Sequence, residues 1–121
     1  MSDRAQHHHH AIDYVEITVT DLPAAKRFYE RAFGWEFTDY GPEYAGFRPP
    51  GGGEAGGLCA GAEVRGGGPL VVLYSGDLEA TLEAVRAAGG AVVREPFAFP
   101  GGRRFHFADP SGNELAVWAA T

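Results

Sequence analysis

Hydrophobic and polar positions alternate strictly where the patterned part of the sequence begins. Within residues 12–19, apolar side chains fall on one side and polar or aromatic side chains on the other: Val15, Ile17 and Val19 against Tyr14, Glu16 and Thr18. A period of two is typical of a β-strand with one buried face. The pattern therefore predicts a half-buried strand over residues 12–19.

An amphipathic helix is predicted directly after this strand. Asp21 supplies an N-cap oxygen, Pro23 fits the first helical turn, and Gly34 ends the pattern. Between them, apolar residues recur at helical spacing: Ala25, Phe28, Tyr29, Ala32 and Phe33. Such a stripe packs against a sheet, so we interpret its aromatic residues as core rather than as a cofactor site.

The second half of the chain repeats this plan. An offset of 56 carries Asp21, Leu22 and Gly34 onto Asp77, Leu78 and Gly90, and an offset of 60 carries Phe47, Pro50 and Gly52 onto Phe107, Pro110 and Gly112. Further strands are predicted at 35–39, 44–48 and 55–61, and again at 91–95, 103–108 and 113–119. The chain is therefore predicted to be α+β, with two tandem βαβββ units at about 12–62 and 69–120.

Length and composition fit one domain. With 121 residues and 45% apolar content, the chain can build one core. A unit of about 50 residues is marginal alone, so the two copies are expected to share that core in a single domain over residues 12–120. Residues 1–11 are predicted to form a disordered tail, and its histidines His7 to His10 fit a purification tag, a native tail or a metal-binding tract.

Net charge and cysteine content limit the binding partners and the cellular location that we expect. The net charge of −6 argues against nucleic acid and anionic membrane surfaces. Cys59 is the single cysteine, so it forms no intrachain disulfide. The sequence contains neither a spanning apolar run nor the apolar core of a signal peptide. We therefore expect a cytoplasmic protein.

The polar sides of the predicted strands gather the candidate site residues on one face. These are Tyr14, Glu16, Thr18, Leu70, Val72, Tyr74, Arg104, His106, Glu114, Ala116 and Trp118. A solvated sheet face explains Glu16 and Arg104. Large apolar groups such as Trp118 are better explained by a small-molecule cleft, with Tyr14, Leu70, Tyr74, Arg104, Glu114 and Trp118 as ligand-binding residues.

The doubled unit resembles a known superfamily. The segment Val19-Thr20-Asp21-Leu22, running into Phe28-Tyr29 and Phe33-Gly34-Trp35, and the turn Asp109-Pro110-Ser111-Gly112-Asn113 are similar to the vicinal oxygen chelate superfamily. Its members include glyoxalase I, bleomycin-resistance proteins, fosfomycin-resistance enzymes and extradiol dioxygenases. The resemblance implies a curved mixed sheet that forms a cleft, helices on its outer face, and a homodimer. It indicates fold better than activity, because this scaffold hosts many reactions.

The resemblance also implies where a divalent metal would bind. The ligand positions of the metalloenzyme members fall on Tyr14, Leu70, Gly56 and Ala116. None of these offers the imidazole or carboxylate that such a metal needs, so we expect no metal and no other cofactor. A displaced site built from Glu16, His106 and Glu114 is the alternative.

Three functions remain open at this point. The first is a metal-independent protein that binds or sequesters a small organic molecule, as bleomycin-resistance proteins do. The second is an enzyme, with Glu16 and His106 as catalytic base and acid in a lyase, isomerase or dioxygenase-like reaction, with or without a divalent metal; the missing ligands disfavour glyoxalase I activity itself. A dimerising accessory domain without a ligand is a third reading. His106 also fits a plain strand histidine that is bonded to Glu16 or Glu114.

Overall fold

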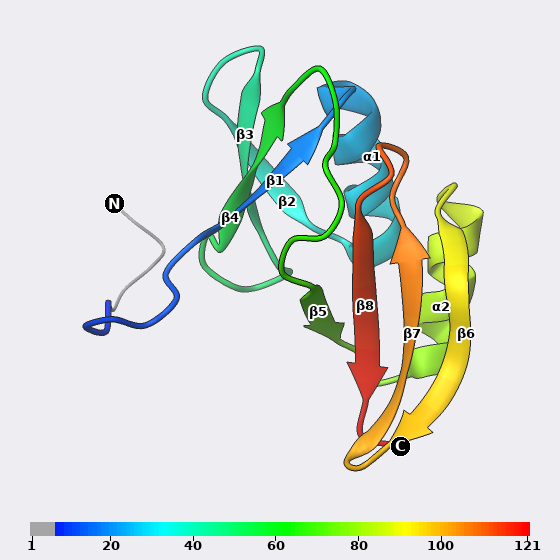
Figure 1. Ribbon diagram of the computed structural model, residues 1–121. Helices are drawn as coiled ribbons and strands as arrows, with labels where there is room; N and C mark the ends of the chain where they lie inside the picture. Colours follow the sequence, from blue (N-terminus) through cyan, green and yellow to red (C-terminus); the bar gives the residue numbers. More distant parts are fainter. Residues whose placement is uncertain (1–6) are drawn as a thin grey trace.

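The computed structural model of the chain describes residues 7–121 and contains eight strands and two helices (Figure 1). The first unit consists of β1 (Val15–Val19), α1 (Leu22–Phe33), β2 (Glu36–Asp39), β3 (Tyr44–Arg48) and β4 (Gly56–Ala60). The second consists of β5 (Val71–Tyr74), α2 (Leu78–Ala87), β6 (Ala91–Phe99), β7 (Gly102–Ala108) and β8 (Glu114–Ala119). The predicted βαβββ repeat and α+β class are confirmed.

Local signals in the sequence explain where both helices begin and end. Asp21 caps α1 by accepting a hydrogen bond from the Ala24 N–H at 3.0 Å, and Asp77 caps α2 in the same way. Gly34 ends α1 at φ 71°, a left-handed conformation that favours glycine. The corresponding glycine after α2 is Gly89, at φ 99°, and not the predicted Gly90.

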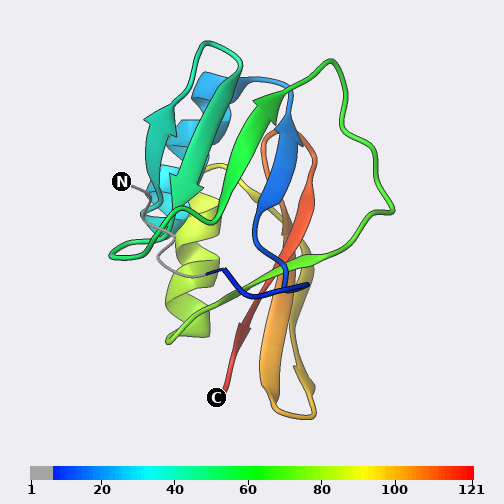
Figure 2. The ribbon, with the colours of Figure 1, turned by 90° about the vertical axis from the view of Figure 1, so that its left-hand side faces the viewer.

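The strands form two four-stranded mixed sheets rather than one continuous sheet. Their orders are β1-β4-β3-β2 and β5-β8-β7-β6, and in each the first strand runs parallel to the last strand of its unit. Figure 2 shows the first sheet nearly face on, with α1 behind it. The two sheets therefore repeat one topology, as the sequence offsets predict.

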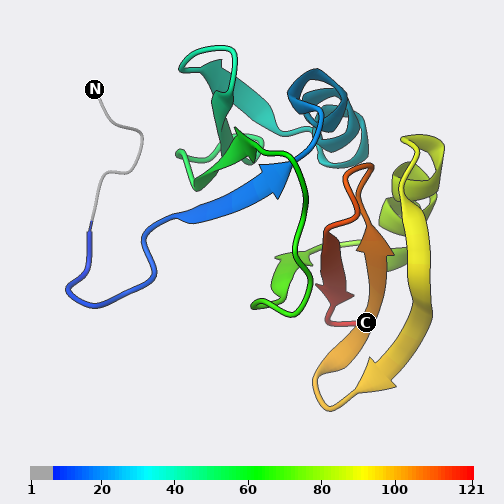
Figure 3. The same cartoon turned by 45° about the horizontal axis from the view of Figure 1, so that its top comes forward.

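Both helices lie on the same side of the sheets and contribute to one core (Figure 3). The predicted inward faces are buried, including Ile17, Val19, Phe105, Phe107, Leu115 and Val117. Phe28 and Phe33 of α1 lie 6.0 and 5.5 Å from Phe107 of the second unit, measured between ring centroids. Because α1 packs against strands of both units, the copies share a single core.

A buried hydrogen-bonded joint also connects the two units. Asp109, which is 4% exposed, accepts hydrogen bonds from the Ser111 and Asn113 N–H groups and from the Tyr29 hydroxyl at 2.8 Å. The Asn113 side chain donates to the Thr18 carbonyl at 2.7 Å. The Asp-Pro-Ser-Gly-Asn turn therefore binds the second unit to α1 and β1 of the first.

Two strand predictions need correction. The first strand begins at Val15, so residues 12–14 precede it. Strand β6 extends to Phe99, beyond the predicted end at residue 95, because it is an edge strand and tolerates Pro96 and two register shifts.

Of the predicted tail, residues 1–6 lie outside the described residues, and His7 Nδ1 lies 2.6 Å from Asp13 Oδ1. Within residues 7–121, neither helix is long and apolar enough to cross a membrane.

Candidate functional site

The face of the second sheet that points away from the helices, here called the open face of sheet B, gathers most of the candidate residues. The strand register places His106 opposite Ala116, Arg104 opposite Trp118, and Tyr74 beside Trp118. It also brings in side chains from β6, with Arg94 opposite His106 and Phe97 opposite Arg104. Strand parity therefore predicted this face correctly on β5, β7 and β8, but missed what β6 contributes.

Aromatic rings and guanidinium groups pack together on the open face of sheet B. The Arg94 guanidinium carbon lies 3.7 Å from the centroid of the Phe97 ring, and that of Arg104 lies 5.3 Å from the same ring and 5.7 Å from Phe99. Trp118 contacts Tyr74 edge-on, with 5.2 Å between their centroids. Stacking of this kind holds a guanidinium in place while leaving its terminal N–H groups available.

A hollow of about 400 Å³ lies within this arrangement, lined by Val72, Phe99, Pro100, Gly101, Arg104 and Trp118. Arg104 Nε is buried there without a hydrogen-bond partner. On the edge strand, Leu70, Val72 and Tyr74 leave large apolar surfaces exposed, with Tyr74 65% exposed. Contiguous apolar exposure around a few polar groups is typical of a binding site.

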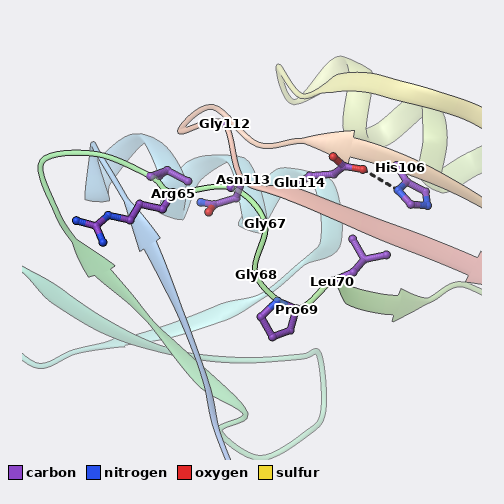
Figure 4. Close-up of a pocket in the computed structure, with 11 residues that line it drawn as sticks. Arg65, Gly67, Gly68, Pro69, Leu70, His106, Gly112, Asn113 and Glu114 are labelled. Atoms are coloured by element: carbon purple, nitrogen blue, oxygen red, sulfur yellow. Dashed lines mark hydrogen bonds and ion pairs between the residues drawn. The ribbon is translucent and has the colours of Figure 1, made fainter.

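His106 lines a second pocket, of about 440 Å³, between the open face and the linker of residues 64–70 (Figure 4). Its Nδ1 lies 2.8 Å from Glu114 Oε2, so this nitrogen donates to the carboxylate. The ring is 7% exposed, and Nε2 has no hydrogen-bond partner. Figure 4 shows Leu70 beside His106, whereas the Arg65 side chain points away from it.

The open face of the first sheet, called the open face of sheet A, carries a different group of side chains. The Tyr44 hydroxyl donates to Glu16 at 2.7 Å and lies 3.3 Å from the Tyr14 hydroxyl, and the Tyr14 and Tyr40 hydroxyls both donate to Glu54. Burial, followed by the hydrogen bonds to Tyr14 and Glu16, raises the pKa of Tyr44 well above its ordinary value. The hydrogen bond to Glu54 raises the pKa of Tyr40 in the same direction.

The register corrects one of the four metal-ligand positions. Val15 pairs with Gly56 and Val71 pairs with Leu115, so Gly56 occupies the core face, and Gly57 is the counterpart of Ala116. A Cβ at Gly57 would collide with the Tyr44 hydroxyl and ring. The Tyr44 side chain therefore fills the space that a ligating side chain would need at this position.

The four positions that the superfamily resemblance implies thus hold Tyr14, Gly57, Leu70 and Ala116. Ala116 is fully buried, and the Tyr14 hydroxyl is engaged with Glu54. These residues do not fit a divalent metal, which needs imidazole or carboxylate ligands. Across residues 7–121, no three His, Cys, Asp or Glu side chains gather closely enough to hold an ion, so Glu16, His106 and Glu114 do not form the displaced site.

The predicted site residues thus divide into groups. His106, Glu114 and Leu70 line one pocket, and Arg104 and Trp118 line the neighbouring hollow. Tyr14 and Glu16 belong to the hydrogen-bonded group on the other sheet, so the hydrogen bonds give Glu16 and His106 different partners. The residues missed by sequence reasoning are Arg94, Phe97 and Phe99; the alternation of Phe97 and Phe99 before Gly101 was the available signal.

Comparisons with known proteins agree with this architecture. The family model described as Glyoxalase/Bleomycin resistance protein/Dioxygenase superfamily matches residues 11–117. Among curated proteins, none matches the sequence.

Solved structures are similar over nearly the whole chain. A glyoxalase/bleomycin resistance protein/dioxygenase family enzyme from Burkholderia phytofirmans PsJN has a TM-score of 0.76 at 20% identity, covering 91% of this chain and 98% of its own. A glyoxalase-related enzyme from Fulvimarina pelagi has a TM-score of 0.75 at 24% identity, covering 91% and 88%. TnmS3, an antibiotic binding protein from Streptomyces sp. CB03234, has a TM-score of 0.69 at 24% identity, covering 97% and 98%. At these identities the likeness establishes the fold.

Proposed function

This chain belongs to the glyoxalase/bleomycin resistance protein/dioxygenase superfamily, and from that premise we propose that it binds a small organic molecule on the open face of sheet B without a metal. Sequestration of that molecule is the biological role we infer. The superfamily name covers both enzymes and binding proteins, so the proposal depends on the site itself.

The observation that carries the proposal is the combination of exposed apolar side chains with a charged side chain that has no charged partner on this face. Val72 and Tyr74 are exposed beside the hollow that Trp118 lines, and Arg104 lines the same hollow and forms no ion pair among residues 7–121. Apolar walls suit a flat hydrophobic body, and the polar groups suit its orientation. TnmS3, which shares the fold, is an antibiotic binding protein and is therefore a precedent for small-molecule binding on this fold.

The proposal that no metal takes part rests on the side chains found at the family's metal-ligand positions. Tyr44 fills the space beside Gly57, and the remaining family positions present Tyr14, Leu70 and Ala116. A ligand would therefore be held by stacking and hydrogen bonds from the protein itself.

Tryptophan fluorescence tests the proposal, because Trp118 lies on the open face and Trp35 lies in the core. The probes are benzene, naphthalene and anthracene skeletons, each prepared as a neutral amide, a carboxylate and an ammonium salt. We expect at least one skeleton to quench Trp118 saturably, with the same affinity in EDTA. The Trp118→Phe variant, which keeps Trp35, should show no saturable quenching.

Two results would overturn this function. One is the absence of saturable quenching by every probe in a protein whose circular dichroism confirms that it is folded. The other is binding that EDTA abolishes and a divalent metal restores, since this would require ligands that the open face does not offer.

One contact favours an enzyme as the second candidate. His106 lines the pocket, and the hydrogen bond from its Nδ1 to Glu114 fixes the imidazole ring, as in an oriented acid–base histidine. A lyase or isomerase of this type would exchange a ligand C–H proton with solvent. In D₂O, loss of a ligand C–H signal by NMR that stops in His106→Gln but continues in Glu16→Gln would support this candidate.

Assembly and location complete the proposal. The superfamily resemblance favours a homodimer, which light scattering coupled to size-exclusion chromatography would measure directly. We propose a cytoplasmic location, since the free Cys59 needs no oxidising compartment.

A further inference from the structure

We propose that the molecule bound on the open face of sheet B is an aromatic organic anion, a planar ring system carrying a carboxylate or phenolate. This inference rests on the proposed function and specifies the class of ligand. Three features support it: the arginines of strands β6 and β7, the aromatic rings around them, and the ion pairs that the neighbouring arginines form.

The arginines around these strands fall into two classes. On the helix side, Arg103 forms two hydrogen bonds with the Glu79 carboxylate, at 2.7 and 3.0 Å, and Arg86 contacts Glu95 at 2.9 Å. On the open face, Arg94 and Arg104 form no ion pair among the described residues and pack against aromatic rings. Arg27 and Arg31 of α1 also lack an ion pair among residues 7–121, and what distinguishes Arg94 and Arg104 is the Phe97 ring that they share.

Their shared ring makes this pair an anion site. Arg94 and Arg104 both pack on Phe97, so two positive charges lie beside the same ring. The rings of Phe97 and Phe99 shield part of Arg104, and its Nε is excluded from water. A charge that has lost part of its hydration interacts more strongly with an incoming anion, and a guanidinium offers paired N–H donors to a carboxylate.

The other residues that line the hollow indicate the size and the aromatic character of the ligand. Trp118 and Phe99 line the hollow beside Arg104, and Val72 closes its edge-strand side. A volume of about 400 Å³ suits a bicyclic or tricyclic aromatic molecule. Among residues 7–121, the strand pairing brings one acidic residue near this face, Glu114, and its carboxylate is engaged with His106. A ring stacked on Trp118 would therefore direct its anionic group toward the two arginines.

The naphthalene probes test the class directly, since 2-naphthoate, 2-naphthamide and 2-naphthylmethylammonium share one body. We expect 2-naphthoate to bind at least about tenfold more tightly than the amide, the usual gain from a charge-assisted hydrogen bond. The ammonium compound should bind most weakly. Added salt should reduce the advantage of the carboxylate.

Matched variants locate the effect. Arg104→Gln and Arg94→Gln should each remove most of the preference for the carboxylate while retaining binding of the amide. Arg103→Gln is the control, because Arg103 lies on the same strand but points to the helix side and pairs with Glu79. It should keep the full preference.

The outcomes separate this inference from the function on which it rests. Equal affinity for naphthoate and naphthamide would overturn the inference and leave the binding function intact. The same holds if Arg103→Gln loses the preference as fully as Arg104→Gln, because the effect would then come from overall charge. If none of the aromatic probes binds, the proposed function itself falls.

Discussion

The joint between Tyr29 and Asp109 provides the sharpest prediction of stability. Replacing Tyr29 by Phe removes one hydroxyl and keeps the ring, which stacks on Trp35 with 4.5 Å between centroids. Asp109 Oδ2 would lose its 2.8 Å hydrogen bond from that hydroxyl and keep only the one from Asn113 Nδ2 at 3.0 Å. The two N–H groups that bind Oδ1 would remain.

The expected cost follows from the burial of both partners. Tyr29 is 0% exposed and Asp109 4% exposed, so water does not replace the lost donor. A hydrogen bond to a charged group contributes about 1.5–3 kcal/mol to the free energy of unfolding. For a domain of this size, roughly 2 kcal/mol corresponds to a fall in Tm of about 8 °C.

Urea and thermal unfolding, followed by circular dichroism, measure this change. Tyr40→Phe is the matched control, because its hydroxyl also donates to a carboxylate at 2.8 Å, that of Glu54, but the residue is 59% exposed. Its free energy of unfolding should change by less than about 0.5 kcal/mol. A Tyr29→Phe variant as stable as wild type would refute the reasoning.

The pH dependence gives a second check on the same pair. Burial, and then the charge of Asp109, raises the pKa of Tyr29 in the folded protein. The folded state therefore favours the neutral hydroxyl, and its stabilisation is complete below the unfolded pKa of about 10 and lost as pH rises above it. The stability difference between wild type and Tyr29→Phe should shrink above pH ~10; a difference that grows there would contradict the assignment.

Three further predictions concern positions outside this joint. Gly57→Ala should lower Tm, because the new Cβ meets Tyr44, and Tyr44→Ala in the same chain should relieve the collision. Asp21→Ala removes the acceptor for the Ala24 N–H and should cost about 1 kcal/mol in urea unfolding, as should Asp77→Ala on α2. With His7 to His10 replaced by alanine, neither EDTA nor zinc should change Tm; a rise with zinc would indicate a metal site in the folded domain.

The core was predictable because its signals are local and periodic. The apolar stripe of α1, its Asp21 cap and its Gly34 end follow directly from residue spacing and side-chain chemistry. The alternation in β1 and β8 also separates core from open face, because a buried face tolerates few polar residues. These elements needed no knowledge of the partner strands.

The contribution of β6 was not predictable in the same way. Pro96 argues against a strand interior, and two register shifts break the period of two between Val92 and Phe97. Arg94 and Phe97 therefore share the open face although simple alternation would separate them. The guanidinium and aromatic pair depends on that irregular edge and becomes visible only in the folded structure.

A difference of one residue in loop length explains the error at Gly56. The offset of 60 holds from Phe47 to Phe107, but the register of the last strands gives 59, from Gly56 to Leu115. The loop between β3 and β4 is therefore effectively one residue longer than its counterpart. In a strand, a shift of one residue moves a side chain to the opposite face.

The corrected register also supports the proposal that the ligand binds on the second sheet. Gly46 pairs with Gly57 where His106 pairs with Ala116, so the first unit has a glycine at the position where the second has a histidine. The space at Gly46 is taken by Glu54 and Tyr40, and that at Gly57 by Tyr44. The polar groups of sheet A therefore hydrogen-bond to one another, whereas Arg104 of sheet B lines a hollow and forms no ion pair among residues 7–121. An incoming anion gains more from a charged group that the protein leaves unpaired, which favours sheet B as the binding half.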